Sequence, residues 1–225
     1  MNNANPRRLF RPARLIALRR MKQGREERSR LRRALFQEQK LRKEAEERCI
    51  TDPLTGAFNR RGLEMRFAEE QSKAKRFGRG LCLVFFDVDN FKAFNSEHGQ
   101  QSGDIVLKGM VGAIRSVLRP YDSVHRYGGE EFIVILPEVS SDWDACSVAE
   151  RIRRRIEAVE LVSFDGSAGL RVTASLGVAS LRDGDSLESL IERANRAEME
   201  AKRRGKNRTC VFSGDGIREA GAAAG

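Results

Sequence analysis

The stretch Arg126-Tyr127-Gly128-Gly129-Glu130-Glu131-Phe132 lies between two runs of β-prone residues. Val124 precedes it and an apolar run over residues 132–136 continues from it, so both flanks favour strands. Two adjacent glycines between two strands indicate a β-hairpin, because glycine reaches positive φ without steric cost. Glycines without side chains also let the backbone approach a ligand closely. The stretch therefore predicts a hairpin with a turn suited to ligand contact.

Two carboxylates, Glu130 and Glu131, follow the glycines at once. Successive side chains on a strand point to opposite faces, so we expect the two glutamates to serve different partners. An anionic ligand would be repelled by both unless a metal ion lay between. One interpretation is a phosphate ester bound through Mg²⁺. The alternative is an ordinary Gly-Gly hairpin with a solvated pair of glutamates.

A second stretch, Leu81-Cys82-Leu83-Val84-Phe85-Phe86, is apolar throughout, which is typical of a central strand covered on both faces. It ends in Asp87-Val88-Asp89, and the two aspartates point to one side of the strand end because they lie two residues apart. Buried or half-buried carboxylates need a cation. Asp87 together with Glu130 therefore predicts an all-oxygen Mg²⁺ site.

Charge divides the 225-residue chain into two parts. Residues 1–49 hold 16 Lys and Arg against 6 Asp and Glu, whereas residues 50–225 are neutral, so the whole net charge of +10 belongs to the first part. The four cysteines are widely spaced, which is typical of reduced thiols in a cytosolic protein. No apolar run approaches the roughly 20 residues that span a bilayer. We expect a cytoplasmic protein, with peripheral contact at the inner membrane left open.

The composition break near Cys49 predicts the domain organisation. Residues 1–24 are Arg-rich and are expected to form a basic tail, either disordered or amphipathic. Residues 25–51 have a helical composition and a poor heptad seam, which predicts a signalling helix or short coiled coil. Residues 52–212 alternate between helical and strand patterns and form the main domain. Residues 213–225 are expected to be a disordered tail.

Five blocks within residues 52–208 resemble, in the same order, the GGDEF domain family of diguanylate cyclases, with the motif in its Gly-Gly-Glu-Glu-Phe form. The blocks are Asp52-Pro53-Leu54-Thr55-Gly56 with Asn59-Arg60-Arg61, residues 86–104, residues 119–132, Ser175-Leu176-Gly177-Val178-Ala179, and residues 194–207. The resemblance implies an α/β (α+β) fold with a central, mostly antiparallel sheet flanked by helices. This fold resembles the nucleotidyl cyclase and polymerase palm fold, here preceded by a long N-terminal helix.

The resemblance also implies an activity, the condensation of two GTP into cyclic-di-GMP and two pyrophosphates by a homodimer with two Mg²⁺ or Mn²⁺ ions per active site. Asp87, the Val88 carbonyl and Glu130 match the metal ligands, and Glu131 joins Asp87 and Glu130 as a catalytic candidate. Asn95 and Asp104 match the pair that reads the guanine edge. The full set of GTP-binding candidates is Phe91, Lys92, Asn95, Asp104, Gly128, Gly129, Lys202 and Lys206.

Arg119-Pro120-Tyr121-Asp122 matches the Arg-x-x-Asp product-inhibition site of the family, and Arg151 matches its second arginine. Arginine contacts phosphate or the guanine O6/N7 edge well, and aspartate accepts from guanine N–H groups. We expect cyclic-di-GMP to bind there and to inhibit the enzyme. The alternative for the same residues is a helix end closed by Arg119, stopped by Pro120 and followed by a turn aspartate.

The chain departs from the usual family pattern at Ser96, Gln100, Asn195 and Met199, and the effect on activity is left open, as are the general base and the activating signal. A first alternative function is a catalytically silent GTP or cyclic-di-GMP receptor that signals through the N-terminal helix. A second is a module that contacts an anionic membrane, nucleic acid or partner through residues 1–49. The metal carboxylates favour the enzyme, because a silent domain has no need for them.

Overall fold

The computed structural model describes residues 10–48, 50–139, 141–162, 164, 166, 169–214 and 216–220. Contacts between Cα atoms divide the chain into two units, Met1–Cys49 and Ile50–Gly225. The composition break near Cys49 falls at the same place. The second unit holds the sheet and the hydrophobic core, and it is the unit that carries the candidate site.

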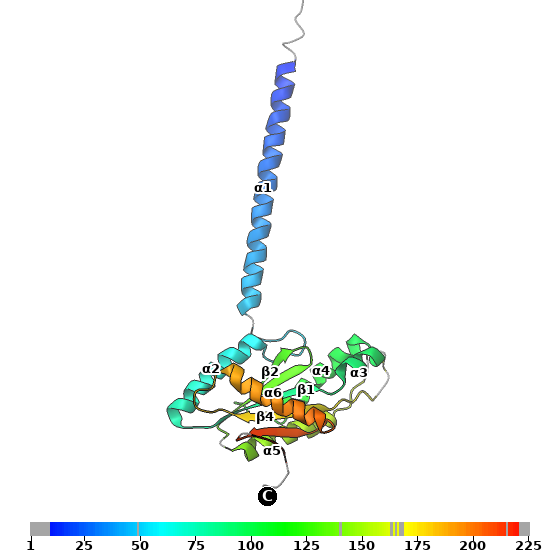
Figure 1. Ribbon diagram of the computed structural model, residues 1–225. Helices are drawn as coiled ribbons and strands as arrows, with labels where there is room; N and C mark the ends of the chain where they lie inside the picture. Colours follow the sequence, from blue (N-terminus) through cyan, green and yellow to red (C-terminus); the bar gives the residue numbers. More distant parts are fainter. Residues whose placement is uncertain are drawn as a thin grey trace, which may run out of the picture. The chain divides into compact units, whose positions relative to one another are not determined.

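The described part of the first unit is one continuous helix, α1 (Phe10–Arg48), as Figure 1 shows. It runs through the predicted boundary at residue 25, so residues 10–24 of the expected basic tail belong to the same helix as residues 25–48. Pro12 lies in the first turn, where its missing N–H would have had no intrahelical partner. Residues 1–9 of the expected basic tail lie outside the described residues. Within the described chain, no helix is long and apolar enough to cross a membrane.

A six-stranded open sheet in the order β2-β3-β1-β4-β5-β6 forms the centre of the second unit. Every neighbouring pair is antiparallel except β4 and β5, which confirms the predicted, mostly antiparallel sheet. The strands are β1 (Leu81–Val88), β2 (Ser123–Gly128), β3 (Glu131–Pro137), β4 (Ala174–Ser180), β5 (Thr209–Ser213) and β6 (Gly216–Glu219).

The last strand corrects the sequence analysis. Residues 213–225 were expected to form a disordered tail, yet residues 216–219 form β6, which pairs with β5 and takes the edge position. Gly214 has a φ of +57°, which lets the chain turn back after β5. Ile217 then lies opposite Phe212 in the register. A four-residue strand with one apolar side chain is too short to show a period-two pattern, which is why the sequence did not predict it.

Five helices complete the second unit, and three of them begin at residues that the sequence marks as caps. The side chains of Asn59, Ser141 and Ser186 each accept a hydrogen bond from a backbone N–H three residues later. The helices are α2 (Arg60–Phe77), α3 (Phe91–His98), α4 (Gln100–Arg115), α5 (Asp142–Glu157) and α6 (Leu187–Arg203). Helix α4 begins at Gln100, directly after Gly99, which has a φ of +81°.

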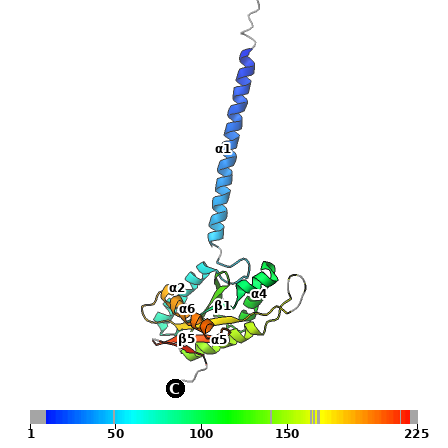
Figure 2. The same ribbon diagram turned by 45° about the vertical axis from the view of Figure 1, so that its right-hand side comes forward.

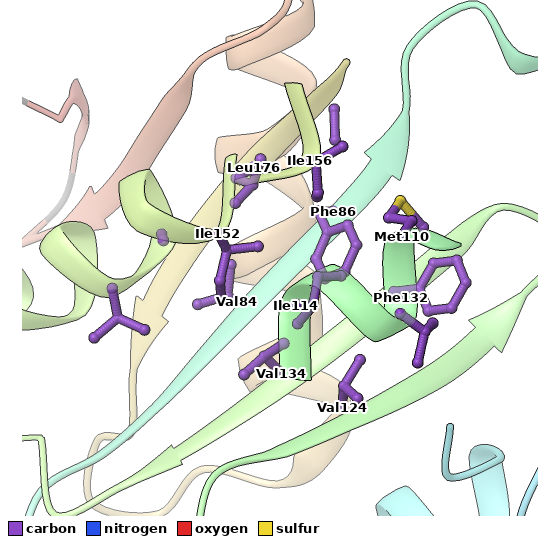
Figure 3. Packing of buried hydrophobic residues seen from close by; sticks show 14 of the residues in the cluster. Val84, Phe86, Met110, Ile114, Val124, Phe132, Val134, Ile152, Ile156 and Leu176 are labelled. Carbon is purple, nitrogen blue, oxygen red and sulfur yellow. The ribbon is translucent and has the colours of Figure 1, made fainter. Parts of the chain in front are cut away.

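The sheet separates two hydrophobic clusters, so the unit has three layers: the sheet and a layer of helices on each of its faces (Figures 1 and 2). Residues of β1 alternate between them: Val84 and Phe86 pack with α4 and α5, whereas Leu83 and Phe85 pack with α2 and α6. Figure 3 shows the α4–α5 side, where Phe86 stacks on Phe132 with a centroid distance of 5.5 Å. Each such buried side chain contributes about 1.5–3 kcal/mol. This packing fixes the end of β1 from both faces.

The close approach of α6 to β4 depends on Gly177. A Cβ atom at this position would lie 2.0 Å from the Ala194 carbonyl oxygen and 2.3 Å from the Glu198 nitrogen. Both atoms belong to the helix backbone, which cannot move aside as a flexible side chain can. The absence of a side chain at Gly177 therefore lets α6 run beside β1 and brings Lys202 to the end of that strand.

Candidate active site

The predicted hairpin is present, with Gly129 and Glu130 in the turn between β2 and β3. The prediction of positive φ is wrong, because neither Gly128 nor Gly129 adopts it. Their lack of side chains has two other consequences. A Cβ on Gly128 would lie 2.9 Å from Glu131 Oε2, and a Cβ on Gly129 would meet no atom within 4 Å. Gly128 thus makes room for a carboxylate, and Gly129 leaves open the space in front of the turn.

Arg126 fixes the turn from behind. Its Nε and Nη2 donate to the Gly129 carbonyl oxygen at 2.9 and 2.7 Å, and its Nη1 lies 3.1 Å from Asp52 Oδ1. Burial alone would raise the pKa of Asp52, but hydrogen bonds from Thr55 and Arg126 hold it below its usual value. Sequence analysis located both segments but did not predict this contact. Arg126 therefore links Asp52, in the first of the five blocks, to Gly129 in the hairpin turn.

Three carboxylates gather at the end of β1. Asp87 lies opposite Glu131 in the β1–β3 register, so their side chains emerge on the same face. Glu130 belongs to the turn, so strand alternation does not govern its direction. Burial raises the pKa of Asp87, the Lys202 charge offsets part of that rise, and the charges of Glu130 and Glu131 raise it again. The half-buried Asp87 therefore lies in the negative field of Glu130 and Glu131.

Lys202 joins this cluster from α6. Its Nζ lies 3.2 Å from Asp87 Oδ2 and 2.9 Å from Glu198 Oε1. Burial would lower the pKa of Lys202, but the two carboxylates raise it above its usual value, so the side chain is a cation. Glu198 is only 2 % exposed, and burial raises its pKa to about 7. Glu198 is not among the residues predicted from the sequence, although a carboxylate on the buried face of an amphipathic helix is an available signal.

The carboxylates suit a divalent cation that is shared with a bound phosphate. No three Asp, Glu, His or Cys side chains among the described residues form a metal centre by themselves. Mg²⁺ is, however, usually held by one or two carboxylates together with substrate phosphates and water. Asp87 supplies one such carboxylate and Glu130 another, and a divalent charge would relieve the repulsion that raises the pKa of Asp87. The residues present therefore fit the ion.

A cavity of about 700 Å³ opens beside the turn, between the hairpin and helices α3 and α4. This volume lies in the range of roughly 300–1,000 Å³ that small-molecule sites occupy. The cavity gathers six of the predicted GTP-binding and catalytic residues, together with two of the positions that depart from the family pattern, Ser96 and Gln100. Its lining consists of Phe91, Lys92, Asn95, Ser96, Gln100, Asp104, Leu107, Arg126, Gly129 and Glu130.

Asn95 lines this cavity and carries an acceptor that no protein group uses. Its Oδ1 is buried and has no hydrogen-bond partner in the described structure. Gly103 on α4 makes room for it, because a Cβ atom there would lie 2.0 Å from Asn95 Oδ1. Buried polar atoms are usually paired, so an unpaired one in a cavity wall indicates a ligand donor. Asp104, one residue further along α4, lines the same cavity with an exposed carboxylate.

Asp89, the first residue after β1, has a different role from Asp87, which lies within the strand. It is buried, and its carboxylate accepts hydrogen bonds from Thr173 Oγ1 and Ser175 Oγ, both at 2.7 Å, and from the Asn207 backbone N–H at 3.0 Å. These three donors satisfy it without a cation, so the expectation that buried carboxylates here need one does not hold for Asp89. Its function is to join β1 to the segment after α6.

The candidate product site gathers its three residues near the surface. Asp122 Oδ2 accepts from the Arg119 backbone N–H at 2.8 Å, and Arg151 Nη2 donates to the Val117 carbonyl oxygen at 2.9 Å. Burial raises the pKa of Asp122, and the Arg119 hydrogen bond together with the charges of Arg119 and Arg151 offsets part of that rise. Both arginines therefore act on Asp122. The Arg119–Asp122 bond is also what the alternative, a simple turn after the helix, requires.

Fold and cavity together define a nucleotide-sized site on an α/β domain with an open, mostly antiparallel sheet. Residues 49–208 match the family model described as "Diguanylate cyclase, GGDEF domain", and the chain belongs to this family. Diguanylate cyclase DgcP of Pseudomonas aeruginosa is 38 % identical over 162 residues, which cover 72 % of this chain and 24 % of DgcP. The chain thus spans about a quarter of the length of that relative.

Two solved structures extend the likeness. Diguanylate cyclase SiaD in complex with its activator SiaC, from Pseudomonas aeruginosa, has a TM-score of 0.69 and 36 % identity, covering 92 % of this chain and 80 % of that one. The coiled coil and GGDEF domain of DgcB from Caulobacter crescentus, in complex with c-di-GMP, has a TM-score of 0.68 and 30 % identity, covering 87 % and 99 %. The family resemblance and the fold expected from the sequence are confirmed.

Proposed function

We propose that this protein is a diguanylate cyclase that condenses two GTP into cyclic-di-GMP and releases two pyrophosphates. The observation that carries the proposal is the unpaired Asn95 Oδ1 in a nucleotide-sized cavity that also contains Glu130. Asn95 would pair with guanine through its amide, which both donates and accepts, and Asp104 would accept from the ring N–H and the amino group. Membership of the family supports this assignment.

The carboxylate cluster would bind the phosphates of GTP through metal ions. Asp87, the Val88 carbonyl and Glu130 would hold two Mg²⁺ or Mn²⁺ ions, which stabilise the charge on the transferring phosphorus when they are bound. Lys202 already lies within 3.2 Å of Asp87 Oδ2, and with Lys206 it would contact the terminal phosphates. The 3′-hydroxyl of one GTP would attack the α-phosphate of the other. Glu131, opposite Asp87 in the register, is placed to contribute to the same charge cluster.

The active form would be a homodimer. One domain offers one such cavity for one GTP, so two domains must face each other to place each 3′-hydroxyl in line with the other α-phosphate. Cyclic-di-GMP would inhibit by binding at Arg119, Asp122 and Arg151, away from the cavity. The complex of the related DgcB with c-di-GMP supports product binding by this fold.

The basic first unit would contact a partner or an anionic membrane. Its exposed apolar side chains include Leu31, Leu35, Phe36 and Leu41, which offer contact area on an otherwise charged helix. The related SiaD forms a complex with an activator protein, which favours a protein partner over a membrane.

A substitution at Glu130 tests the proposal. Glu130→Gln keeps the shape of the side chain and removes the charge, so we expect loss of turnover of GTP with an unchanged circular dichroism spectrum. Glu97→Gln, an exposed glutamate on α3, is the control and should retain activity. Near wild-type product formation by Glu130→Gln at ordinary Mg²⁺ would exclude Glu130 as a ligand. A wild-type protein that binds GTP without turnover would instead favour the silent receptor.

A further inference from the structure

The turn after α6 has an unusual backbone. Lys206 and Asn207 are consecutive non-glycine residues with φ angles of +63° and +46°. Left-handed conformations are disfavoured for residues with a side chain, although asparagine tolerates them better than lysine does. Such conformations persist only where the surrounding structure holds them, and they concentrate at functional sites. In this turn the contacts of Asn207 hold the backbone.

Asn207 is held through three polar groups. Its backbone N–H donates to Asp89 Oδ2 at 3.0 Å, its Oδ1 accepts from Arg153 Nη1 at 2.7 Å, and its Nδ2 donates to Glu157 Oε1 at 2.8 Å. Arg153 and Glu157 lie one turn apart on α5. The Arg153 side chain is only 12 % exposed and is itself fixed by Glu150 at 3.2 Å and Glu157 at 2.9 Å. Arg153 is thus the buried member of the clamp, whereas the Glu157 side chain is 46 % exposed.

The clamped turn carries Lys206 to the end of β1. Lys206 Nζ donates to Asn90 Oδ1 at 2.5 Å, and Asn90 follows Asp89 directly. The same strand end carries Asp87, so the ammonium group lies in the region of the carboxylate cluster. Helix α5 contributes no residue to the lining of the nucleotide-sized cavity. Lys206 and Asn207 do not line this cavity either. The direct side-chain contacts of Arg153 and Glu157 with the turn after α6 are their hydrogen bonds to Asn207, the neighbour of Lys206.

We propose that Arg153 and Glu157 are positioning residues of the active site, which clamp Asn207 so that Lys206 reaches the terminal phosphates of the bound nucleotide. The inference rests on the proposed function for the identity of the nucleotide. The role of the clamp is to keep two residues in a backbone conformation that the free chain rarely adopts. Loss of the clamp lets the turn relax, and Lys206 then spends little time at the phosphate position.

Binding measurements on the full chain test the proposal. For Arg153→Ala we expect about tenfold weaker binding of a non-hydrolysable GTP analogue with Mg²⁺, because a charged contact to the terminal phosphates is misplaced. Binding of GMP, which lacks those phosphates, should not change. In turnover, KM for GTP should rise more than kcat falls. Arg153→Lys keeps the charge and should recover part of the affinity.

The matched control is Arg154→Ala. Arg154 is the next residue on α5, its side chain is 75 % exposed, and its contact with Glu150 is 3.7 Å long. The Arg154→Ala variant should bind the GTP analogue and GMP as the wild type does. If Arg153→Ala does not fold, Glu157→Gln replaces it, because this partly exposed residue can be changed with less risk, and the analogue should then bind about threefold more weakly with GMP unaffected.

A double-mutant cycle with Lys206→Ala shows whether the effect passes through Lys206. We expect Arg153→Ala to have almost no further effect once Lys206 is removed. The proposal is overturned if the two effects add, if GMP binding falls as much as analogue binding, or if Arg153→Ala behaves like Arg154→Ala. A wild-type chain that binds the analogue but makes no cyclic product would contradict the proposed function and leave this test of the clamp valid.

Discussion

Gly103 determines where the amide of Asn95 lies, although it does not line the cavity itself. Gly103→Ala would place a methyl group 2.0 Å from the present position of Asn95 Oδ1, so the asparagine side chain must rotate away. We expect KM for GTP to rise about tenfold and the preference for GTP over ATP to fall, because a misplaced reader no longer pairs with guanine. Steady-state kinetics with both nucleotides measure this change.

Gly112→Ala is the control for that prediction. Gly112 lies on the same helix, and a Cβ atom there would meet no atom within 4 Å. It should leave kinetics unchanged and stabilise the helix by up to about 1 kcal/mol. Equal kinetics for the Gly103→Ala variant and the wild type would show that Asn95 does not read the base.

Glu198 makes the stability of the domain depend on pH. Burial raises its pKa from an ordinary value of 4.5 to about 7, so between these values the folded state binds the proton more tightly than the unfolded state does. Stability must therefore fall as pH rises through this window. Glu198→Gln cannot titrate, and its free energy of unfolding should exceed that of the wild type at pH 8 by up to about 3 kcal/mol, with little difference near pH 5.

Urea unfolding in the presence of a chelator, at pH 5 and pH 8, measures the effect. Glu200→Gln is the control, because hydrogen bonds from Arg204 lower the pKa of Glu200 and its replacement should bring no advantage that grows with pH. A Glu198→Gln variant with the same pH dependence as the wild type would show that Glu198 is charged in the fold at pH 5.

Residues with a local signal were predictable and residues with a distant partner were not. Glu130, Asn95 and Asp104 stand in recognisable motifs, and the structure brings all three to one cavity. The roles of Arg153 and Arg126 depend on Asn207 and Asp52, which lie far away in the sequence. No periodicity or spacing reports such contacts, because they arise only when the sheet aligns the segments.

At the scale of elements, long and strongly patterned segments were predicted well. Strand β1 begins at Leu81, the first residue of the apolar run that predicted it, and ends at Val88. The start of α4 carries no apolar signal in the sequence, because its first two residues are Gln100 and Gln101. The strand β6 was missed because its pairing with β5, rather than its own composition, makes it a strand.

The turn between α4 and β2 carries the prediction on product inhibition. Arg119→Ala should relieve inhibition by cyclic-di-GMP and leave initial rates nearly unchanged, because the Arg119 side chain is exposed and lies outside the cavity lining. The backbone bond from Arg119 to Asp122 remains in the variant, so the turn itself should persist. Initial rates at increasing cyclic-di-GMP measure the effect. Undiminished inhibition, or inhibition that is purely competitive with GTP, would leave the simple turn as the explanation.

At the scale of the whole molecule, the two units have different roles. The second unit, Ile50–Gly225, has its own core and the whole candidate site, whereas α1 offers a weak seam for pairing. Removal of residues 1–49 should therefore lower activity per protomer strongly at low protein concentration and weakly at high concentration, since pairing then depends on the second unit alone. A dilution series of both forms measures this. A rate per protomer that depends on neither dilution nor truncation would contradict the dimeric mechanism.

The central claim is the condensation of two GTP into one cyclic dinucleotide, and product stoichiometry tests it most directly. The purified full chain is incubated with GTP and Mg²⁺, the nucleotides are separated by chromatography, and pyrophosphate is counted in parallel. The account predicts cyclic-di-GMP with two pyrophosphates for each molecule formed, and no product when the divalent ion is chelated. A folded protein that binds GTP yet forms no cyclic-di-GMP, or that releases GDP and phosphate, would contradict it.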